Sequence, residues 1–361
     1  MKRILHIVGN MAPDGMSNFL MGIYRRLDRE KLQFDFIVMG EKPDNYHEEI
    51  RSPGGRVYKI PRMAKQPLAY YRQIRDIVKK NQYEIVFRQT DTATVAVDLL
   101  AAKAGGAKMR IPHAHSTRAV HPVFHALLRP CLNRLATQRY ACSQAAGEFM
   151  FGKAPYRVVY NGIDLEQYAF CESVRREKRK SLAIGDRLAF GHIGNFFSAK
   201  NHLFLLEIFA EIKRLRRDAV FYLIGDGEQR KAICDKIKCL GLENDVMLLG
   251  ERSDVAELIQ ALDCMIFPSL YEGLPIAVIE AQDAGLPCLL SDTITDEVML
   301  TDIVEKESLE QSAKLWAQRA VRLAEHYAGD GKRTGHPAEL AKAGYDLSNL
   351  VDVYRRLGAE E

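Results

Sequence analysis

Two glutamates with seven residues between them, Glu272 and Glu280, mark the segment of the sequence that is most informative about chemistry. The run FPSLYEGLPIAVIEAQDAGLP begins with the end of a predicted strand, and Pro275 can start a helix because its missing N–H is not needed at the first helical position. Glu272 is therefore predicted in the loop before that helix. The amides of Gly273 and Leu274, at the helix start, could hold a phosphate.

Glu280 is predicted inside the same helix, after the apolar run Ile276–Ile279 and before the helix end at Gly285. A carboxylate in that position is expected to be half-buried, so it needs hydrogen-bonding partners. The vicinal hydroxyls of a ribose would supply them, as they do for the acidic residue of dinucleotide-binding folds. A purely structural glutamate bonded to backbone is the alternative.

A second loop of interest, the run GNFFSAK from Gly194 to Lys200, leaves a predicted strand and enters a strong helix near Asn201. A lysine at a helix N-terminus adds to the positive end of the helix dipole, which is unfavourable unless an anion binds there. We therefore favour an anion site at Lys200 over a solvated surface lysine. The next strand ends in a tight glycine turn, Gly225 to Gly227.

Two loops of the first half could also carry chemistry. His113 and His115 in RIPHAHST are two residues apart, so on a strand they share a face. His115 is the better placed to face a cleft, with a satisfied structural histidine as the alternative. The glycines of the loop GNMAPDGMSNF, Gly9 and Gly15, permit close backbone approach, and Ser17 could cap the next helix. A plain turn into a helix explains that loop equally well.

Short apolar runs that alternate with helical patterns indicate parallel sheets covered by helices on both faces. The predicted strands are Ile4–Val8, Phe34–Val38, Arg56–Lys59, Ile85–Arg88, Met109–His115 and Arg139–Cys142, then Leu188–Gly194, Ala219–Gly225, Val246–Gly250, Cys264–Pro268 and Pro287–Ser291. Two such series predict two doubly wound domains, with a boundary near the charge run ESVRREKRK. Ligands of such folds bind beyond the carboxyl ends of the strands, so the expected site is the cleft between the domains.

Composition excludes several classes of protein. The chain has 361 residues and a net charge of only +4, which argues against a dedicated nucleic-acid binder. No apolar run approaches the ~18 residues of a membrane span, and the N-terminus resembles a strand more than a signal peptide. Seven scattered cysteines are typical of free thiols in a reducing cytoplasm. We expect a cytoplasmic protein.

Taken together, these segments resemble the retaining glycosyltransferases of family four, with the closest likeness to bacterial enzymes that build exopolysaccharide, capsule or lipopolysaccharide. Glu272 and Glu280 match the family's E-x7-E motif. The likeness covers nearly the full length, and its specificity lies in the order and spacing of the segments. They include RIPHAHST, YACSQAAGEFMFG, VVYNGIDLEQY, the GxxxxxK loop, LIGDGE, LLGERSDVAELIQALDCMIFPSLYEGLPIAVIEAQDAGLP and SDTITDEVML.

The resemblance implies an α/β fold of the GT-B type, in which two doubly wound Rossmann-like domains have parallel sheets facing an interdomain cleft. The acceptor-binding domain would span 1–168, completed by a C-terminal helix at 345–361. The donor-binding domain would span 169–344. Asn161 and Gly162 would mark the entry to the linker.

The resemblance also implies a role for each motif residue. Glu272 would contact the hydroxyls of the donor sugar, Glu280 would hold the ribose, and Lys200 would bind the donor diphosphate. His115 occupies the place of the family's sugar-contacting histidine. The remaining donor-site residues would be Gly15 by the phosphates or acceptor, Gly225 and Gly227 along the nucleotide pocket, Arg252 near the base, and Gly273 and Leu274 at the helix start.

One position departs from the family. Arginine usually follows the glycine of the GxxxxxK loop, and this chain has Asn195 there. The loss of a charge-assisted phosphate contact costs about 1.5–3 kcal/mol unless another cation, such as Arg252, compensates. A catalytically inert paralogue that senses nucleotide sugars or assists a working transferase is therefore the alternative function. A dehydrogenase ranks below both, because no G-x-G-x-x-G follows a strand.

The predicted reaction moves a hexosyl group, with retention, from a nucleotide sugar to a glycan or to an acceptor carried on a lipid diphosphate. UDP-sugars are the first expectation for the donor and GDP-mannose the second. Since no D-x-D motif presents paired carboxylates, we expect neither a required metal ion nor another cofactor.

The segment 120–139 has Phe124, Leu127, Leu128, Cys131 and Leu135 at helical spacing, with several arginines between them. Pro130 is expected to bend or split this helix. A core-packed helix with a basic outer face is one interpretation. The other is reversible contact with an anionic membrane surface, which would place the enzyme on the inner face of the cell membrane.

Overall fold

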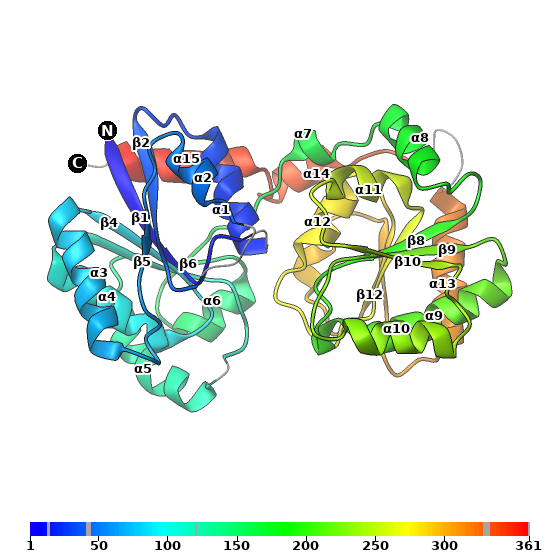
Figure 1. Cartoon of the computed structure of the whole chain (residues 1–361), viewed down its shortest axis with the longest axis horizontal. Coiled ribbons are helices and arrows are strands. Elements are labelled where there is room, and N and C mark those ends of the chain that lie inside the picture. Colours follow the sequence, from blue (N-terminus) through cyan, green and yellow to red (C-terminus); the bar gives the residue numbers. More distant parts are fainter. Residues whose placement is uncertain (13–14, 41–44, 120, 328–332, 360–361) are drawn as a thin grey trace. The chain divides into compact units, whose positions relative to one another are not determined.

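The computed structural model of the protein describes residues 1–12, 15–40, 45–119, 121–327 and 333–359. The chain divides into two compact units (Figure 1). Unit 1 comprises Met1–Gly162 and Asp346–Glu361, and unit 2 comprises Ile163–Tyr345. The units therefore divide at Gly162, ahead of the predicted end at 168.

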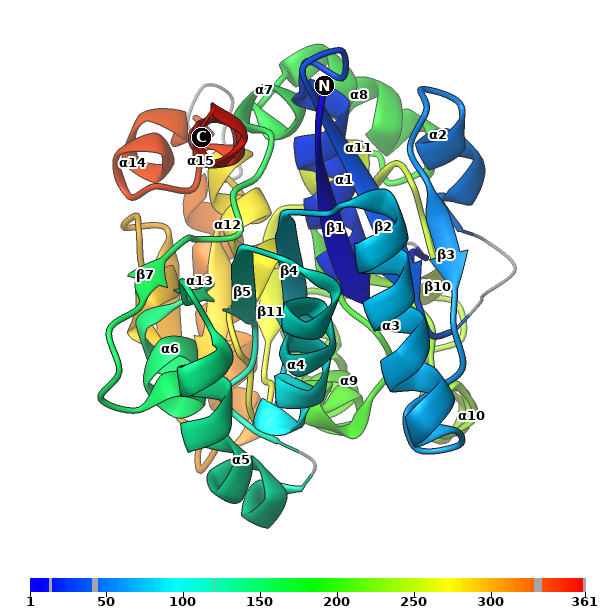
Figure 2. The ribbon, with the colours of Figure 1, turned by 90° about the vertical axis from the view of Figure 1, so that its left-hand side faces the viewer.

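Unit 1 is built on a seven-stranded parallel sheet in the order β3-β2-β1-β4-β5-β6-β7. Its strands are β1 (Lys2–Val8), β2 (Leu32–Val38), β3 (Val57–Lys59), β4 (Ile85–Thr90), β5 (Met109–Ala114), β6 (Tyr140–Ala141) and β7 (Arg157–Val158). Its helices are α1 (Gly15–Arg26), α2 (His47–Arg51), α3 (Pro67–Asn81), α4 (Ala96–Gly105), α5 (Pro122–Leu135), α6 (Gln144–Phe151) and α15 (Leu347–Ala359), with a 3-10 turn at Ala93–Val95. Helices α3 and α4 lie side by side over one face of the sheet (Figure 2), and α1 packs with α15 on the other.

Unit 2 has a six-stranded parallel sheet in the order β10-β9-β8-β11-β12-β13. Its strands are β8 (Ala189–Ile193), β9 (Val220–Ile224), β10 (Val246–Gly250), β11 (Cys264–Phe267), β12 (Cys288–Ser291) and β13 (Val304–Glu307). Its helices are α7 (Leu165–Tyr168), α8 (Glu172–Ser181), α9 (His202–Leu215), α10 (Arg230–Cys239), α11 (Val255–Ala261), α12 (Ile276–Asp283), α13 (Ala313–Tyr327) and α14 (Pro337–Lys342), with 3-10 turns at Ser198–Lys200 and Asp296–Val298. Helices α9, α10 and α13 pack together, and α8 packs on α11 (Figure 1).

The prediction of two doubly wound α/β domains is confirmed, and every predicted strand is present within a few residues. In each sheet the strand order reverses next to the first strand, between β1 and β4 and between β8 and β11. Two strands were not predicted. The segment β7 has only two residues, and β13 has the sequence VEKE, in which charged residues hide the strand pattern.

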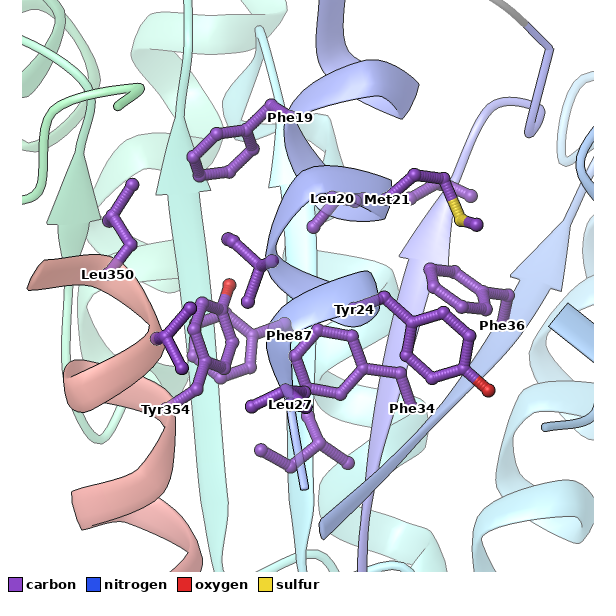
Figure 3. Packing of buried hydrophobic residues seen from close by; sticks show 14 of the residues in the cluster. Phe19, Leu20, Met21, Tyr24, Leu27, Phe34, Phe36, Phe87, Leu350 and Tyr354 are labelled. Carbon is purple, nitrogen blue, oxygen red and sulfur yellow. The ribbon is translucent and has the colours of Figure 1, made fainter. Parts of the chain in front are cut away.

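The C-terminal helix α15 belongs to the core of unit 1, although the start of unit 1 is far away in sequence. Figure 3 shows Tyr354 of α15 beside Phe87 of the sheet, and Leu350 of α15 belongs to the same buried cluster. The Tyr354 ring lies 5.0 Å from the rings of both Phe34 and Phe87, measured between centroids. The prediction of a helix over 345–361 is confirmed between Leu347 and Ala359, and residues 360–361 lie outside the described part of the chain.

The charge run that the sequence places near the domain boundary forms helix α8 of unit 2. Arg175 and Arg179 of this helix both form ion pairs with the buried Asp263, at 2.5 and 3.1 Å. Arg333 is also buried and donates hydrogen bonds to backbone carbonyls that include those of Ile259 and Leu262. These guanidinium groups satisfy carbonyls at the C-terminal end of α11, where the helix dipole favours positive charge.

Helix α5 runs without interruption through Pro130, so of the two expected effects, a bend or a split, the split does not occur. Proline removes one backbone donor from a helix interior, and α5 continues for five residues beyond it to Leu135. The apolar residues of this helix do not share one environment. Leu132 and Leu135 are buried, whereas Phe124 and Leu127 are 60% and 70% exposed.

We expect Tyr354→Ala to lower the free energy of unfolding of unit 1 by about 3–5 kcal/mol, because it removes a large ring from a packed aromatic core. Urea denaturation followed by circular dichroism measures this loss. The control is Arg355→Ala on the same helix, an exposed side chain whose removal should change stability by less than about 0.5 kcal/mol. Equal effects of the two substitutions would contradict the packing role of α15.

Candidate functional site

Three strand-to-helix loops of unit 2 pack backbone against backbone at the carboxyl edge of its sheet. The amide of Gly225 donates to the carbonyl of Gly250 at 2.8 Å. A Cβ atom on Gly225 would lie 2.1 Å from the carbonyl oxygen of Gly194, and one on Gly227 would lie 2.8 Å from the nitrogen of Phe196. Gly225 also has a φ of +138°, which side-chain-bearing residues rarely adopt. Both glycines of the predicted turn are therefore required by packing.

Lys200 and Glu272, 72 residues apart in the sequence, meet at this edge in a hydrogen-bonded ion pair. The Lys200 Nζ atom lies 2.6 Å from Oε1 of Glu272, which also accepts a hydrogen bond of 2.8 Å from the hydroxyl of Ser269. Both side chains are largely but not fully buried, at 19% and 11% exposed. The ammonium also lies 5.9 Å from the centre of the Phe267 ring. Two of the residues singled out in the sequence thus form one polar cluster.

The loop that carries Lys200 is tied to the loop that carries Glu272 by two further hydrogen bonds. The amide of Leu270 donates to the carbonyl of Ala199 at 2.7 Å, and the Asn201 side-chain amide donates to the carbonyl of Pro268 at 3.1 Å. Asn201 adopts a left-handed conformation, with φ of 56°, directly before α9. The relative position of the two loops is therefore fixed by backbone as well as by charge.

Two buried histidines that the sequence analysis did not single out lie next to Lys200. The Nδ1 atom of His192 lies 2.9 Å from the carbonyl oxygen of Ile266, so Nδ1 carries the proton. Burial lowers the pKa of His192 well below its usual range. Burial, with the charge of Lys200, lowers the pKa of His202 to about 4. Both rings are neutral at pH 7, so neither histidine adds positive charge beside Lys200. The feature of the sequence that could have pointed to them is their position, because His192 lies within a strand and His202 at the start of the next helix.

Glu280 projects from α12 beside Tyr168, the last residue of α7. The two side chains are hydrogen-bonded, and the phenol O–H is the donor to the carboxylate. Burial raises the pKa of Glu280 to about 7, and the hydrogen bond from Tyr168 opposes part of that rise. The structure therefore gives Glu280 a side-chain partner, where the sequence suggested a ribose or the backbone. Tyr168 is a residue that the sequence analysis missed.

The other predicted donor-site residues occupy the same edge or its surroundings. Pro275 directly precedes α12, so Gly273 and Leu274 lie in the loop before the helix, as expected. Asn195 is exposed. The Arg252 guanidinium forms a two-point ion pair with Asp254, with both contacts at 2.7 Å, so its charge is already engaged. That pairing weakens the expectation that Arg252 replaces the missing arginine.

In unit 1, His113 and His115 lie on one face as their spacing predicts, with ring centroids 4.1 Å apart. The Nε2 atom of His115 lies 2.7 Å from Oε1 of Gln89, an acceptor, so this nitrogen carries the proton. The Gln89 amide in turn lies 3.4 Å from Nδ1 of His6. Burial lowers the pKa of His115 well below its usual range, and the ring is neutral at pH 7.

Gly15 is the first residue of α1, so the glycine-bearing loop does lead into a helix N-terminus. Ser17 was expected to cap this helix, but it is the third residue of the helix and is buried. With Ser17 as the cap, the first helical residue would be Asn18, and α1 begins three residues before that. Pro13 and Asp14, which belong to the same loop, lie outside the described residues.

This edge of unit 2 therefore combines a lysine ammonium, a carboxylate beside it, the loop before a helix, and a second, partly desolvated carboxylate on that helix. Such a set can bind an anion and several hydroxyl groups together. Among the residues that the structure describes, no group of three or more His, Cys, Asp or Glu side chains is arranged to hold a metal ion.

Two family models match the chain and together cover most of it. The model described as Glycosyltransferase Family 4 matches residues 13–167, and the model described as Glycosyl transferases group 1 matches residues 174–318. The match positions follow the two compact units: the first falls almost entirely within unit 1 and the second within unit 2.

Curated relatives and solved structures agree with these matches. EpsF of Bacillus subtilis (strain 168), whose name assigns it to the glycosyltransferases, is 35% identical over 98% of this chain and 96% of its own length. A galactosyltransferase of Escherichia coli that uses UDP-Gal and an α-D-GlcNAc-diphosphoundecaprenol acceptor is 28% identical over 60% of this chain and 59% of its own. The crystal structure of Anabaena Alr3699/HepE with UDP and glucose superimposes with a TM-score of 0.79 at 19% identity over the whole of both chains. The fold is GT-B, as expected.

We expect the raised pKa of Glu280 to make stability fall as pH rises. The neutral carboxyl is favoured in the folded protein, so between about pH 4.5 and 7 the folded state holds a proton that the unfolded chain releases. The loss across this window is at most about 3 kcal/mol. Glu280→Gln, which stays neutral, should flatten the dependence in urea titrations at several pH values. Parallel curves for the two proteins would show that Glu280 is not desolvated.

Proposed function

The chain belongs to glycosyltransferase family 4, and we propose that it transfers a hexosyl group, with retention of configuration, from a UDP-sugar to a growing glycan. The acceptor that we propose is a glycan carried on a lipid diphosphate in cell-surface polysaccharide synthesis. Support comes from relatives whose names describe a lipid-diphosphate acceptor and capsule biosynthesis, and from a structural neighbour that was crystallised with UDP-glucose. The observation that carries the proposal is the pairing of Lys200 with Glu272 beside the start of α12.

Each group of this cluster has a task in such a transfer. Breaking the glycosidic bond to the nucleotide gives the sugar oxocarbenium character and leaves negative charge on the departing diphosphate. Lys200 and the amides of Gly273 and Leu274 stabilise that developing charge electrostatically. Glu272 accepts hydrogen bonds from sugar hydroxyls and orients the ring. The departing phosphate oxygen takes the proton of the acceptor hydroxyl as the new bond forms.

The nucleoside part of the donor would bind along the same edge. Glu280 would accept hydrogen bonds from the ribose hydroxyls in its deprotonated form, and Tyr168 would hold that carboxylate in place. Gly225 and Gly227 present bare backbone to the nucleotide, and Arg252 lies toward the base. In unit 1, Gly15 and His115 keep the roles that the family resemblance implies, near the phosphates or acceptor and at the donor sugar.

The donor prediction is tested with a panel of UDP- and GDP-sugars in thermal-shift and transfer assays. A donor present at about 100 times its dissociation constant stabilises the protein by about 2.7 kcal/mol. We expect a UDP-hexose or a UDP-N-acetylhexosamine to do so. No stabilisation by any nucleotide sugar would contradict the proposal. Stabilisation without turnover on any acceptor would favour the inert paralogue. That alternative is considered because Asn195 stands where the family usually has an arginine.

The roles of the two glutamates are tested separately. We expect Glu272→Gln to abolish nearly all transfer while UDP affinity changes less than about threefold. Glu280→Ala should weaken UDP binding by about ten- to a hundredfold, the cost of roughly 1.5–3 kcal/mol for losing charged hydrogen bonds. Calorimetric titration with UDP measures both. The division of roles fails if the two variants lose equal affinity for UDP.

Metal independence is the third part of the proposal. Since the charge of the leaving diphosphate is met by Lys200 and by backbone amides, we expect transfer to persist in excess EDTA. The assay compares initial rates with and without the chelator, and with added magnesium or manganese. Activity that disappears with EDTA and returns with either metal would overturn this expectation.

We further propose that helix α5 contacts an anionic membrane surface reversibly. Val123, Phe124 and Leu127 are 68%, 60% and 70% exposed, and Arg134, also exposed, follows two turns after Leu127 on the same side. Apolar groups can enter the headgroup boundary while each basic residue near an anionic leaflet adds about 1 kcal/mol of attraction. Among the described residues, no helix is long and apolar enough to cross a membrane.

Co-sedimentation with vesicles tests this contact. We expect binding to vesicles that contain anionic lipid, weakened by salt and reduced by Arg129→Glu combined with Arg134→Glu. Phe124→Ser combined with Leu127→Ser should also reduce it, while UDP affinity in unit 2 remains unchanged. An equal affinity for neutral and anionic vesicles would assign the exposed face of α5 some other role.

A further inference from the structure

The segment SDTIT, which begins at Ser291, the last residue of β12, contacts the loop that carries Glu272 through hydroxyl groups. The hydroxyls of Ser291 and Thr293 lie 2.6 and 2.8 Å from the carbonyl oxygen of Ser269. They also lie 2.8 Å from each other. Ser291 and Ser269 are completely buried. The carbonyl oxygen of Ser269, which has two lone pairs, can therefore accept from two side chains of the neighbouring segment.

The side chain of Ser269 continues this connection to the ion pair. Its hydroxyl donates to Oε1 of Glu272 at 2.8 Å, the same oxygen that receives the Lys200 ammonium at 2.6 Å. One residue therefore has its backbone held by Ser291 and Thr293 and its side chain bonded to the carboxylate. The result is a chain of hydrogen bonds from the end of β12 to Glu272.

We propose that Ser291 and Thr293 are positioning residues, which set the orientation of Glu272 by holding the carbonyl of Ser269. This proposal rests on the function proposed above, in which Glu272 orients the donor sugar. The peptide between Ser269 and Leu270 is held on its amide side by the bond to Ala199 and on its carbonyl side by these two hydroxyls, so removing them leaves one of its two attachments. Small displacements of an orienting group reduce the rate of the chemical step more than they reduce the affinity for the rest of the substrate.

The hydroxyls of Ser291 and Thr293 contact each other as well as the Ser269 carbonyl. They have two protons for three contacts, so at any moment one contact lacks a proton of its own. Thr293→Val keeps the shape of the side chain and leaves Ser291 free to give its proton to the carbonyl at all times. We therefore expect Thr293→Val to have a modest effect, and Ser291→Ala combined with Thr293→Val to have the full effect.

Hydrogen exchange tests the positioning itself without any donor or acceptor. The amide of Leu270, which donates to Ala199, reports opening of the loop. We expect its exchange to accelerate about fivefold in the double variant, the factor that corresponds to one lost hydrogen bond. The control is Thr295→Val in the same segment, whose hydroxyl accepts only from the Glu297 amide among the contacts described. Unchanged exchange at Leu270 in the double variant would overturn the proposal.

Kinetics then connect the positioning to transfer. We expect kcat to fall about tenfold or more in the double variant, while the dissociation constant for UDP changes less than twofold. Thr293→Ser, which keeps the hydroxyl, should behave as wild type. Faster exchange with an unchanged kcat would overturn the link to Glu272. If the wild-type protein transfers no sugar from any donor, the proposed function fails, while the exchange result still decides whether these hydroxyls hold the loop.

Discussion

Parallel strands place every strand-to-helix loop of a unit at the same edge of its sheet, and the candidate site depends on this constraint. Lys200 follows β8 and Glu272 follows β11, two strands that are hydrogen-bonded neighbours although the residues are 72 positions apart. The strand order reverses at this pair of strands, which is the position where doubly wound sheets bind their ligands. The ion pair forms because topology brings its two loops together.

Close contact between these loops limits which residues can occupy them. The backbone of Gly225 packs so tightly against Gly194 that no side chain fits at Gly225. A Cβ atom on Gly194 would lie 3.1 Å from Cε of Lys200, so this packing also places the Gly194 backbone beside the lysine. The opposite edge of the sheet has different chemistry: there Arg175, Arg179 and Asp263 hold the end of α11 to α8. One edge of unit 2 thus carries the groups that could meet a ligand, and the other carries charged groups whose partners are internal.

The sequence predicted the strand series, the helix starts around Pro275 and the positions of Lys200 and Glu272 in loops, because these follow from apolar periodicity and from proline and glycine chemistry. It could not predict contacts that depend on neighbouring loops. The hydrogen bond between Tyr168 and Glu280 joins two residues that belong to different sequence motifs. In the sequence, Ser291 and Thr293 look like ordinary polar residues of a loop. Helix α8 was obscured because two of its arginines, Arg175 and Arg179, pair with the buried Asp263, whereas a charge run usually indicates a solvated segment. The prediction that Ser17 caps α1 was wrong for a local reason, because a serine near a helix start can also lie inside the first turn.

The electrostatics of unit 2 explain why its polar cluster can exist before any ligand binds. Without a partner, Lys200 would be a largely buried, unpaired charge beside two neutral histidines, which is energetically unfavourable. Its ion pair with Glu272 compensates that charge. A diphosphate that arrives at Lys200 would add negative charge next to the same carboxylate, so Glu272 must then find other donors. Sugar hydroxyls are suitable donors, and Ser269 already supplies one. Anion binding at the lysine and hydroxyl binding at the glutamate are therefore coupled by a single contact. This coupling favours a ligand that carries both groups over one that carries either alone, and a nucleotide sugar is such a ligand.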